Sequence, residues 1–424
     1  AVEAVEAVEA VEAVEAVELG EVGEVVEGMS MVVYQGRRRA AAWARLMAGV
    51  SVAFVLASCG GTDVAGVGSG GTGIRLASVS YGSISGFGSV IVNGVRYDDA
   101  GAALSNDDGT APGPLGLGMV VEVRGDIDST GLAGTADAIN VVSEARGTVV
   151  NRSSSGFSLL GLPVRANAST VYDDAASVSD GDYVEVYGIY DRSSGTLTAT
   201  RIERRAPGGA FKVRGTVGAV DAVAKRFQLG TITVDYSATL PAPSGLAAGT
   251  PVRVHASGEP VAGMLAATRI DIVTPPALGN VSKLEIEGVI DRFVSLADFS
   301  VDGVRVDGAA AAFEGGVASG LGIGVRVEVE GPVESGIVRA SRIEFEDEED
   351  GEFELKGLVT DFVDVASFRV RGTRVDASGS VRYEGGGAAD LRDGACVQVK
   401  GKLQTTPTGS EVLATDIHFE SSCS

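Results

Sequence analysis

The sequence predicts an all-β protein built from tandem small domains, and three observations lead to this fold class. Glycine is abundant, with 60 residues, and only 5% of the residues are aromatic. Frequent glycine and valine beside few aromatic residues are typical of short strands joined by tight turns. A chain of 424 residues is longer than one hydrophobic core usually fills, which is about 250 to 300 residues. The third observation is a pattern that recurs five times along the chain.

The recurring pattern has two fixed marks. Each unit opens with a glycine ahead of alternating residues, at Gly82, Gly147, Gly215, Gly288 and Gly357. Each unit closes with Ala-x-x-Ile, at Ala136–Ile139, Ala199–Ile202, Ala267–Ile270, Ala340–Ile343 and Ala414–Ile417. The spacing of about 70 residues exceeds the roughly 20 to 50 of solenoid repeats, so we expect each unit to enclose its own core.

Each unit is expected to form a small barrel. Its four or five strands alternate with period two, and Asn93-Gly94 and Asp302-Gly303 predict tight hairpins because both residue types tolerate positive φ. A short Ala/Gly segment before the fourth strand favours an OB-like barrel over an open sheet. The five predicted barrels cover residues 78–143, 144–205, 211–273, 283–346 and 353–421.

The first unit also carries a resemblance to a known family. Gly82 to Val95 reads GSISGFGSVIVNGV, and this segment resembles a bacterial domain of unknown function that occurs in tandem in envelope lipoproteins of Gram-negative bacteria. Weaker echoes follow in the other four units, so the resemblance covers roughly residues 78–420. It implies a small β-barrel and an envelope location, and it implies no particular activity or site residues.

The N-terminal part is predicted to be a targeting signal. Residues 1–28, which begin with repeated Ala-Val-Glu, are interpreted as translated upstream sequence. Residues 29–58 then combine an arginine-rich stretch with an apolar run, Leu46–Ala57, that is too short to span a bilayer. This order is typical of a bacterial signal peptide rather than of a membrane-spanning helix.

A lipid anchor is expected where this signal ends. The segment Leu56-Ala57-Ser58-Cys59 resembles the lipobox of bacterial lipoproteins, in which the cysteine is joined to diacylglycerol and becomes the mature N-terminus. The alternative is an ordinary secretory peptide in which Cys59 only lies near the cut. The resemblance also implies outer-membrane rather than inner-membrane sorting, because Gly60 stands where retained lipoproteins usually have an aspartate. We therefore expect a protein of the cell envelope that is held to the membrane by its lipid. Residues 59–77 are interpreted as a Gly-rich tether.

Charge and residue content narrow the function classes. The formal net charge is -23, which disfavours nucleic acid as a partner because such binding draws its affinity from lysine and arginine. No nucleophile with a base and no metal cluster is visible, so the sequence does not predict an enzyme. A carbohydrate-active enzyme with spatially paired carboxylates is the disfavoured alternative. The two histidines, His255 and His418, are expected to face solvent.

Calcium is the one cofactor that the sequence raises, at two places. Asp126, Asp128 and Asp137 loosely match a calcium-binding loop, although a plain hairpin turn explains them as well. The acidic run Glu346, Asp347, Glu348, Glu349 and Asp350 is either a solvated linker or a calcium bridge between the last two barrels. The second interpretation would make the protein a calcium-stiffened stalk or adhesin.

Cys396 and Cys423 both belong to the last unit, and an oxidising envelope would allow a disulfide between them. The alternative is two free thiols. Taken together, these observations predict a non-enzymatic envelope lipoprotein whose barrels either bind a protein or polysaccharide partner or act as a spacer.

Overall fold

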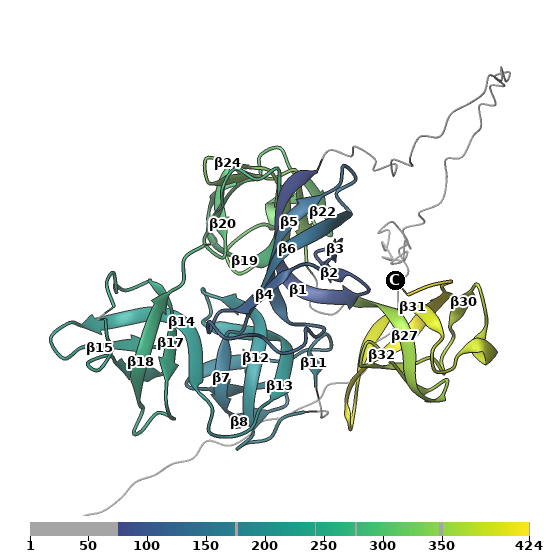
Figure 1. Cartoon of the computed structure of the whole chain (residues 1–424). Helices are drawn as coiled ribbons and strands as arrows, with labels where there is room; N and C mark the ends of the chain where they lie inside the picture. Colours follow the sequence, from purple (N-terminus) through teal and green to yellow (C-terminus); the bar gives the residue numbers. More distant parts are fainter. Residues whose placement is uncertain (1–74, 174–176, 242, 276–277, 347–350, 424) are drawn as a thin grey trace, which may run out of the picture. The chain divides into compact units, whose positions relative to one another are not determined.

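The computed structural model describes residues 75–423, apart from 174–176, 242, 276–277 and 347–350. All of them lie in one compact unit, Gly70–Ser424. This part of the chain consists of strands and two short 3-10 turns, η1 (Ala318–Gly320) and η2 (Ala388–Asp390), which confirms the predicted all-β class (Figure 1). None of its helices is long and apolar enough to cross a bilayer. The predicted signal peptide and Cys59 lie outside the described residues.

The first barrel closes through five strands. β1 (Leu76–Phe87) pairs antiparallel with β2 (Val90–Val92) on one side and with β5 (Val120–Ile127) on the other. β2 pairs with β3 (Val95–Asp98), β3 runs parallel to β6 (Ala133–Val142), and β6 returns antiparallel to β5. The ring of pairings is therefore continuous, as in a small OB-like barrel. The short β4 (Ala103–Asn106) also runs parallel to β6.

The other four copies repeat this order of pairing, so the predicted tandem of small barrels is confirmed. The second barrel contains β7 (Ala145–Thr148), β8 (Val150–Ser153), β9 (Gly156–Leu159), β10 (Leu162–Arg165), β11 (Val171–Tyr172), β12 (Tyr183–Asp191) and β13 (Thr196–Arg204). The third contains β14 (Phe211–Asp221), β15 (Arg226–Leu229), β16 (Ile232–Asp235), β17 (Pro251–Ala256) and β18 (Met264–Ile272).

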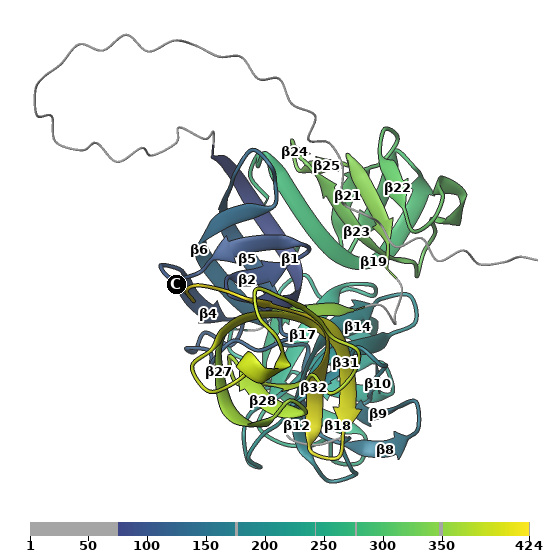
Figure 2. The same ribbon diagram turned by 90° about the vertical axis from the view of Figure 1, so that its right-hand side faces the viewer.

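The fourth barrel contains β19 (Lys283–Ser295), β20 (Asp298–Val301), β21 (Val304–Asp307), β22 (Ala312–Glu314), β23 (Arg326–Gly331), β24 (Val333–Glu334), β25 (Ile337–Arg339) and β26 (Arg342–Phe345). The fifth contains β27 (Glu352–Asp364), β28 (Ser367–Val370), β29 (Thr373–Asp376), β30 (Arg382–Glu384), β31 (Cys396–Thr406) and β32 (Gly409–Phe419). Figure 2 looks into the fifth barrel, where β27, β28, β31 and β32 curve around one centre.

The predicted hairpins join the second and third strands of the barrels. Asn93 and Asp302 adopt positive φ values of 50° and 47°, and each is followed by a glycine that also has positive φ. Such turns match the twist of the paired strands and set their register. With this register, a phenylalanine of the hairpin points into the core of the barrel. Examples are Phe299 and Phe368, which are 0% and 2% exposed.

Neighbouring copies also pair through their backbones. β1 runs parallel to β19, with Ser78 opposite Lys283, and it also pairs with β27 at Gly86 and Glu354. β7 of the second barrel pairs antiparallel with β14 of the third. These pairings join strand edges of different barrels, and charged side chains on the paired strands are buried there, among them Lys212, Glu285 and Glu354.

Candidate functional site

A cavity of about 400 Å³ lies between the first, second and fifth barrels, and ten of its 28 lining residues are charged. Its arginines outnumber its carboxylates, although the whole chain is strongly acidic. The arginines are Arg146, Arg201, Arg205, Arg369, Arg371 and Arg374, and the carboxylates are Asp107, Asp173, Glu185 and Glu203. We call this cavity, defined by these ten residues, the arginine cleft.

The second barrel supplies the paired half of the arginine cleft. Arg201 Nε donates to Glu203 Oε1 at 2.6 Å, and its Nη2 reaches Asp173 Oδ1 at 2.8 Å. Glu185 accepts from Arg146 at 2.5 Å and from Arg205 Nε at 2.9 Å. Burial alone would raise the pKa of Glu185, but the hydrogen bond and charge of Arg146 outweigh burial and leave the pKa lowered. Glu185 therefore stays ionised, and the bonds of this network hold its arginines in fixed positions.

The fifth barrel supplies the unpaired half, from the hairpin β28–β29. Arg369 and Arg374 stand directly opposite each other in this hairpin, and Arg371 lies in its turn with φ of 52°. Arg374 Nη1 donates to the Thr408 carbonyl at 2.7 Å, while Arg371 Nε donates to the Lys356 carbonyl at 3.2 Å. Among the described residues Arg371 and Arg374 form no ion pair, so their charges face the cavity without a carboxylate partner.

A second charged region lies on the fourth barrel, and we call it the carboxylate cluster. It consists of Glu285, Glu287, Glu328, Glu330, Glu344 and Glu346. Arg342 is shared among several of them and reaches Glu328 Oε1 at 2.7 Å. Burial is the main cause that raises the pKa of Glu328 to about 8. Nearby glutamates raise this pKa further, and Arg342 lowers it only in part. Burial likewise raises the pKa of Glu346 to about 7.

The residues predicted to bind calcium do not come together as one donor set in the described part of the chain. Asp128 Oδ1 accepts the Thr130 and Gly131 amides at 2.9 and 3.1 Å, which is the bonding of a hairpin turn. Asp126 lies on β5, and Asp137 is exposed on β6. No group of three or more His, Cys, Asp or Glu side chains between residues 75 and 423, the undescribed gaps aside, could hold a metal ion.

The acidic linker can be placed only in part. Glu346 belongs to the carboxylate cluster, whereas Asp347, Glu348, Glu349 and Asp350 lie outside the described residues. Calcium binding at this linker therefore stays a prediction.

One expectation about the histidines was wrong. His255 is only 12% exposed, and its Nε2 lies 2.9 Å from Asp271 Oδ2. Its strand β17 faces the loop of the first barrel that carries Asp108, so the outward side of the strand is covered. Burial lowers the pKa of His255. His418 is half-exposed beside Glu384, in agreement with the expected outward position.

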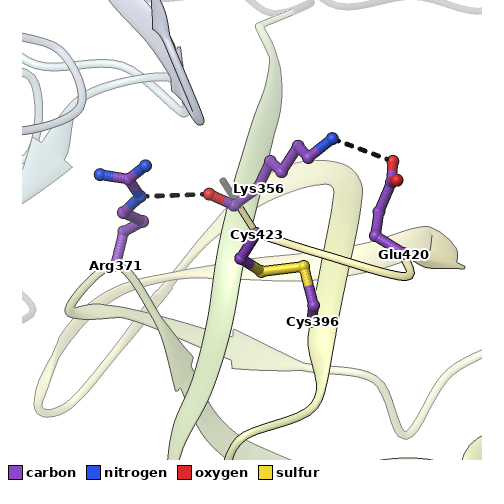
Figure 3. The surroundings of a disulfide bond; sticks show 5 residues. All are labelled: Lys356, Arg371, Cys396, Glu420 and Cys423. Atoms are coloured by element: carbon purple, nitrogen blue, oxygen red, sulfur yellow. Dashed lines mark hydrogen bonds and ion pairs between the residues drawn. A yellow bond between two sulfur atoms is a disulfide. The ribbon is translucent and has the colours of Figure 1, made fainter. Parts of the chain in front are cut away.

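A disulfide joins Cys396, at the start of β31, to Cys423 beyond the last strand, with 5.5 Å between the Cα atoms (Figure 3). Lys356 Nζ lies 3.2 Å from Glu420 Oε1 close by, so the C-terminal segment is held to β27 as well. Both links fix the chain end against the fifth barrel.

Removing this disulfide is expected to destabilise the fifth barrel moderately. Replacing both Cys396 and Cys423 by serine frees a loop with a sequence separation of 27, and we expect a loss of about 2 kcal/mol because only the chain end is released. Urea denaturation of the parent and the variant measures the difference. A reducing agent should destabilise the parent and leave the double variant unchanged, and an equal response of the two proteins would contradict the prediction.

The arginine cleft was not predicted, although one signal for it was visible. The segment Arg369-Val370-Arg371-Gly372-Thr373-Arg374 places three arginines in six residues of an acidic chain. The net charge of the whole chain does not reveal this local excess of arginine, because acidic residues elsewhere outweigh it. The carboxylates of the cleft come from other copies, and their proximity depends on contacts that no single repeat encodes.

Comparisons with known proteins show similarity to one domain family. No match is found among curated protein sequences. Among solved structures, the chain is similar to one titled "drosophila Unr CSD456", at 14% identity over 49% of this chain and 98% of that one. The TM-score of 0.13 is too low for an argument about fold or function. One family model, described as Domain of unknown function (DUF5666), matches residues 146–203, 287–344 and 356–418, in the second, fourth and fifth barrels. Three of the five barrels are therefore similar to the DUF5666 domain, and the matched segments together cover less than half of the chain.

Proposed function

We propose that this chain is a non-enzymatic protein of the cell envelope, held to a membrane through lipidated Cys59, and that its barrels form a binding array. The observation that carries the proposal is the arginine cleft, a cavity of about 400 Å³ built by three copies together. Ligand sites are usually concave cavities of about 300 to 1,000 Å³ with a few fixed polar groups. A spacer would need no such cavity.

The charge state of the cleft favours binding over hydrolysis. A glycosidase needs one carboxyl with a raised pKa as general acid and a second carboxylate as base or nucleophile. In the arginine cleft, Glu185 has a lowered pKa, and Glu203 and Asp173 are each bonded to Arg201. A lowered pKa makes Glu185 a poor proton donor, so it suits the role of a hydrogen-bond acceptor better than that of a general acid.

The anchoring part of the proposal predicts a clear change of location. Replacing Cys59 by alanine removes the thiol that would carry diacylglycerol, so the protein should move from the membrane fraction to the soluble fraction of cells that express it. Ser58→Gly keeps a small residue before the cysteine and should stay in the membrane fraction. Fractionation followed by immunoblotting measures both variants. Membrane retention of Cys59→Ala would contradict lipid anchoring.

A further inference from the structure

We propose that the arginine cleft binds a sugar acid, meaning a hydroxylated ring or chain that carries a carboxylate. The inference rests on the proposed binding function and names its ligand class. Three features support it: the unusual composition of the hairpin β28–β29, the absence of an ion pair for Arg371 and Arg374 among the described residues, and the mixture of polar groups around them.

The hairpin of the fifth barrel differs from its counterparts in the other four copies. At the cross-strand position held by Arg369 and Arg374, the first four barrels place Ile91 with Arg96, Ser158 with Pro163, Gln228 with Thr233, and Ser300 with Arg305. Two opposed arginines therefore occur only in the fifth of these hairpins. The barrel fold does not require them, since four copies form the same hairpin with other pairs.

Opposed arginines carry a cost that the protein offsets only in part, through one exposed carboxylate. Like charges directly opposite each other destabilise an antiparallel pair. Arg96 on the first hairpin reaches Glu354 at 2.5 Å, and Arg305 on the fourth lies 3.7 Å from Asp298. In the fifth, the counterpart is Asp361, 3.6 Å from Arg369 and 75% exposed. A bound oxyanion would neutralise this pair, and the guanidinium fork suits a carboxylate.

The rest of the lining favours a sugar acid over a phosphate chain. Asp173 is 44% exposed in the cleft and offers free lone pairs to hydroxyl groups. Together with Glu203 and Glu185 it would repel the closely spaced charges of a polyphosphate or nucleic acid backbone. Tyr172, Pro114 and Leu115 add apolar surface to the same lining. A ligand with one carboxylate per ring and many hydroxyl groups satisfies all three kinds of group.

Calorimetric titration of the full chain at low ionic strength tests this assignment. The probe is a galacturonic acid trimer, the neutral control is a galactose trimer, and inorganic phosphate tests for a simple anion site. The variant combines Arg369→Gln, Arg371→Asn and Arg374→Thr, which are residues that the other copies carry in this hairpin at Gln228, Asn93 and Thr233. Arg305→Thr changes a hairpin arginine outside the cleft and serves as the control variant.

We expect the acidic trimer to bind the parent and the Arg305→Thr variant alike, and the triple variant at least about tenfold more weakly. Circular dichroism checks that the triple variant is folded, and Arg374→Thr alone should weaken binding in the same direction. Equal binding of the neutral trimer, tighter binding of phosphate, or no heat with the acidic trimer would each overturn the assignment. None of these results would alter the location measured for Cys59→Ala, so the two proposals fail separately.

Discussion

Replacing Glu144 by alanine is expected to destabilise the second and third barrels by about 3 to 5 kcal/mol, the usual effect of removing one partner from a buried ion pair. Glu144 is fully buried just before β7. It accepts from Arg214 Nη1 at 2.6 Å and from Arg253 Nη2 at 3.0 Å, and both arginines belong to the third barrel. Burial alone would raise the pKa of Glu144, but the two arginines outweigh it and leave the pKa lowered.

The large effect follows from what the substitution would leave behind. Arg214 is 3% exposed and Arg253 is 12% exposed, and the Nε atom of each already has no hydrogen-bond partner. Without the carboxylate, two guanidinium groups would remain buried, with Arg214 bonded to Asp302 and Arg253 close to Asp107. Each guanidinium would keep one carboxylate partner instead of two, and a buried charge that is only partly compensated is costly because water cannot solvate it.

Urea denaturation followed by circular dichroism measures the loss of stability. Asp137→Ala removes a carboxylate from an exposed strand position and should change the midpoint very little. The double variant Glu144→Leu with Arg214→Met should lose less than Glu144→Ala, since apolar pairs often replace buried ion pairs without a penalty. A loss below about 1 kcal/mol for Glu144→Ala would show that water reaches these arginines.

The sequence was sufficient to predict what one copy needs in order to fold. The positive φ of Asn93 and Asp302 was predictable because asparagine or aspartate before glycine strongly favours a tight hairpin. The burial of Phe299 follows from the period of two in the strand that carries it. These are local rules, and five copies in register made them easy to recognise.

The contacts between copies could not be predicted in this way. Lys212 occupies a position that alternation alone makes outward-facing, yet it is 1% exposed and lies 3.0 Å from both Asp107 and Asp108. Its burial follows from the pairing of β7 with β14 and from a loop of the first barrel that covers this strand. The same loop of the first barrel also covers His255, which is why the expectation that His255 faces solvent was wrong. A period-two pattern predicts which residues of a strand point into the barrel and which point outward. It does not predict which outward residues a neighbouring barrel covers.

Thermal stability of the fourth barrel is expected to fall as the pH rises from about 5 to about 8, because of Glu328. Its folded pKa of about 8 is raised above the ordinary glutamate pKa of 4.5, so the folded state keeps a proton that the unfolded chain releases. The stabilisation is complete below the unfolded pKa and is lost as the pH rises through the folded pKa. Glu346, with a pKa of about 7, acts in the same direction.

Burial also raises the pKa of Glu285 on the same barrel, which acts in the same direction as Glu328. Two further groups act in a different range or with the opposite sign. Burial tends to raise the pKa of Asp108, but Lys212 and Arg146 hold it at about 2, so its contribution is lost only in acid. His255 has a lowered pKa, and its contribution to stability is lost as the pH falls. The role of Glu328 is therefore measured best as the difference between a variant and the parent at each pH.

Glu328→Gln keeps the size of the side chain and cannot ionise. We expect the variant to melt at a higher temperature than the parent at about pH 8 and close to it at about pH 5, because only the parent must ionise a buried group as the pH rises. Glu314→Gln is the matched control, since Glu314 lies 3.4 Å from the same Arg342 but is 56% exposed. It should follow the parent at both pH values. If Glu328→Gln showed the parent's full loss between the two pH values, the charged form of Glu328 would have to be stabilised by Arg342 at 2.7 Å rather than penalised by burial.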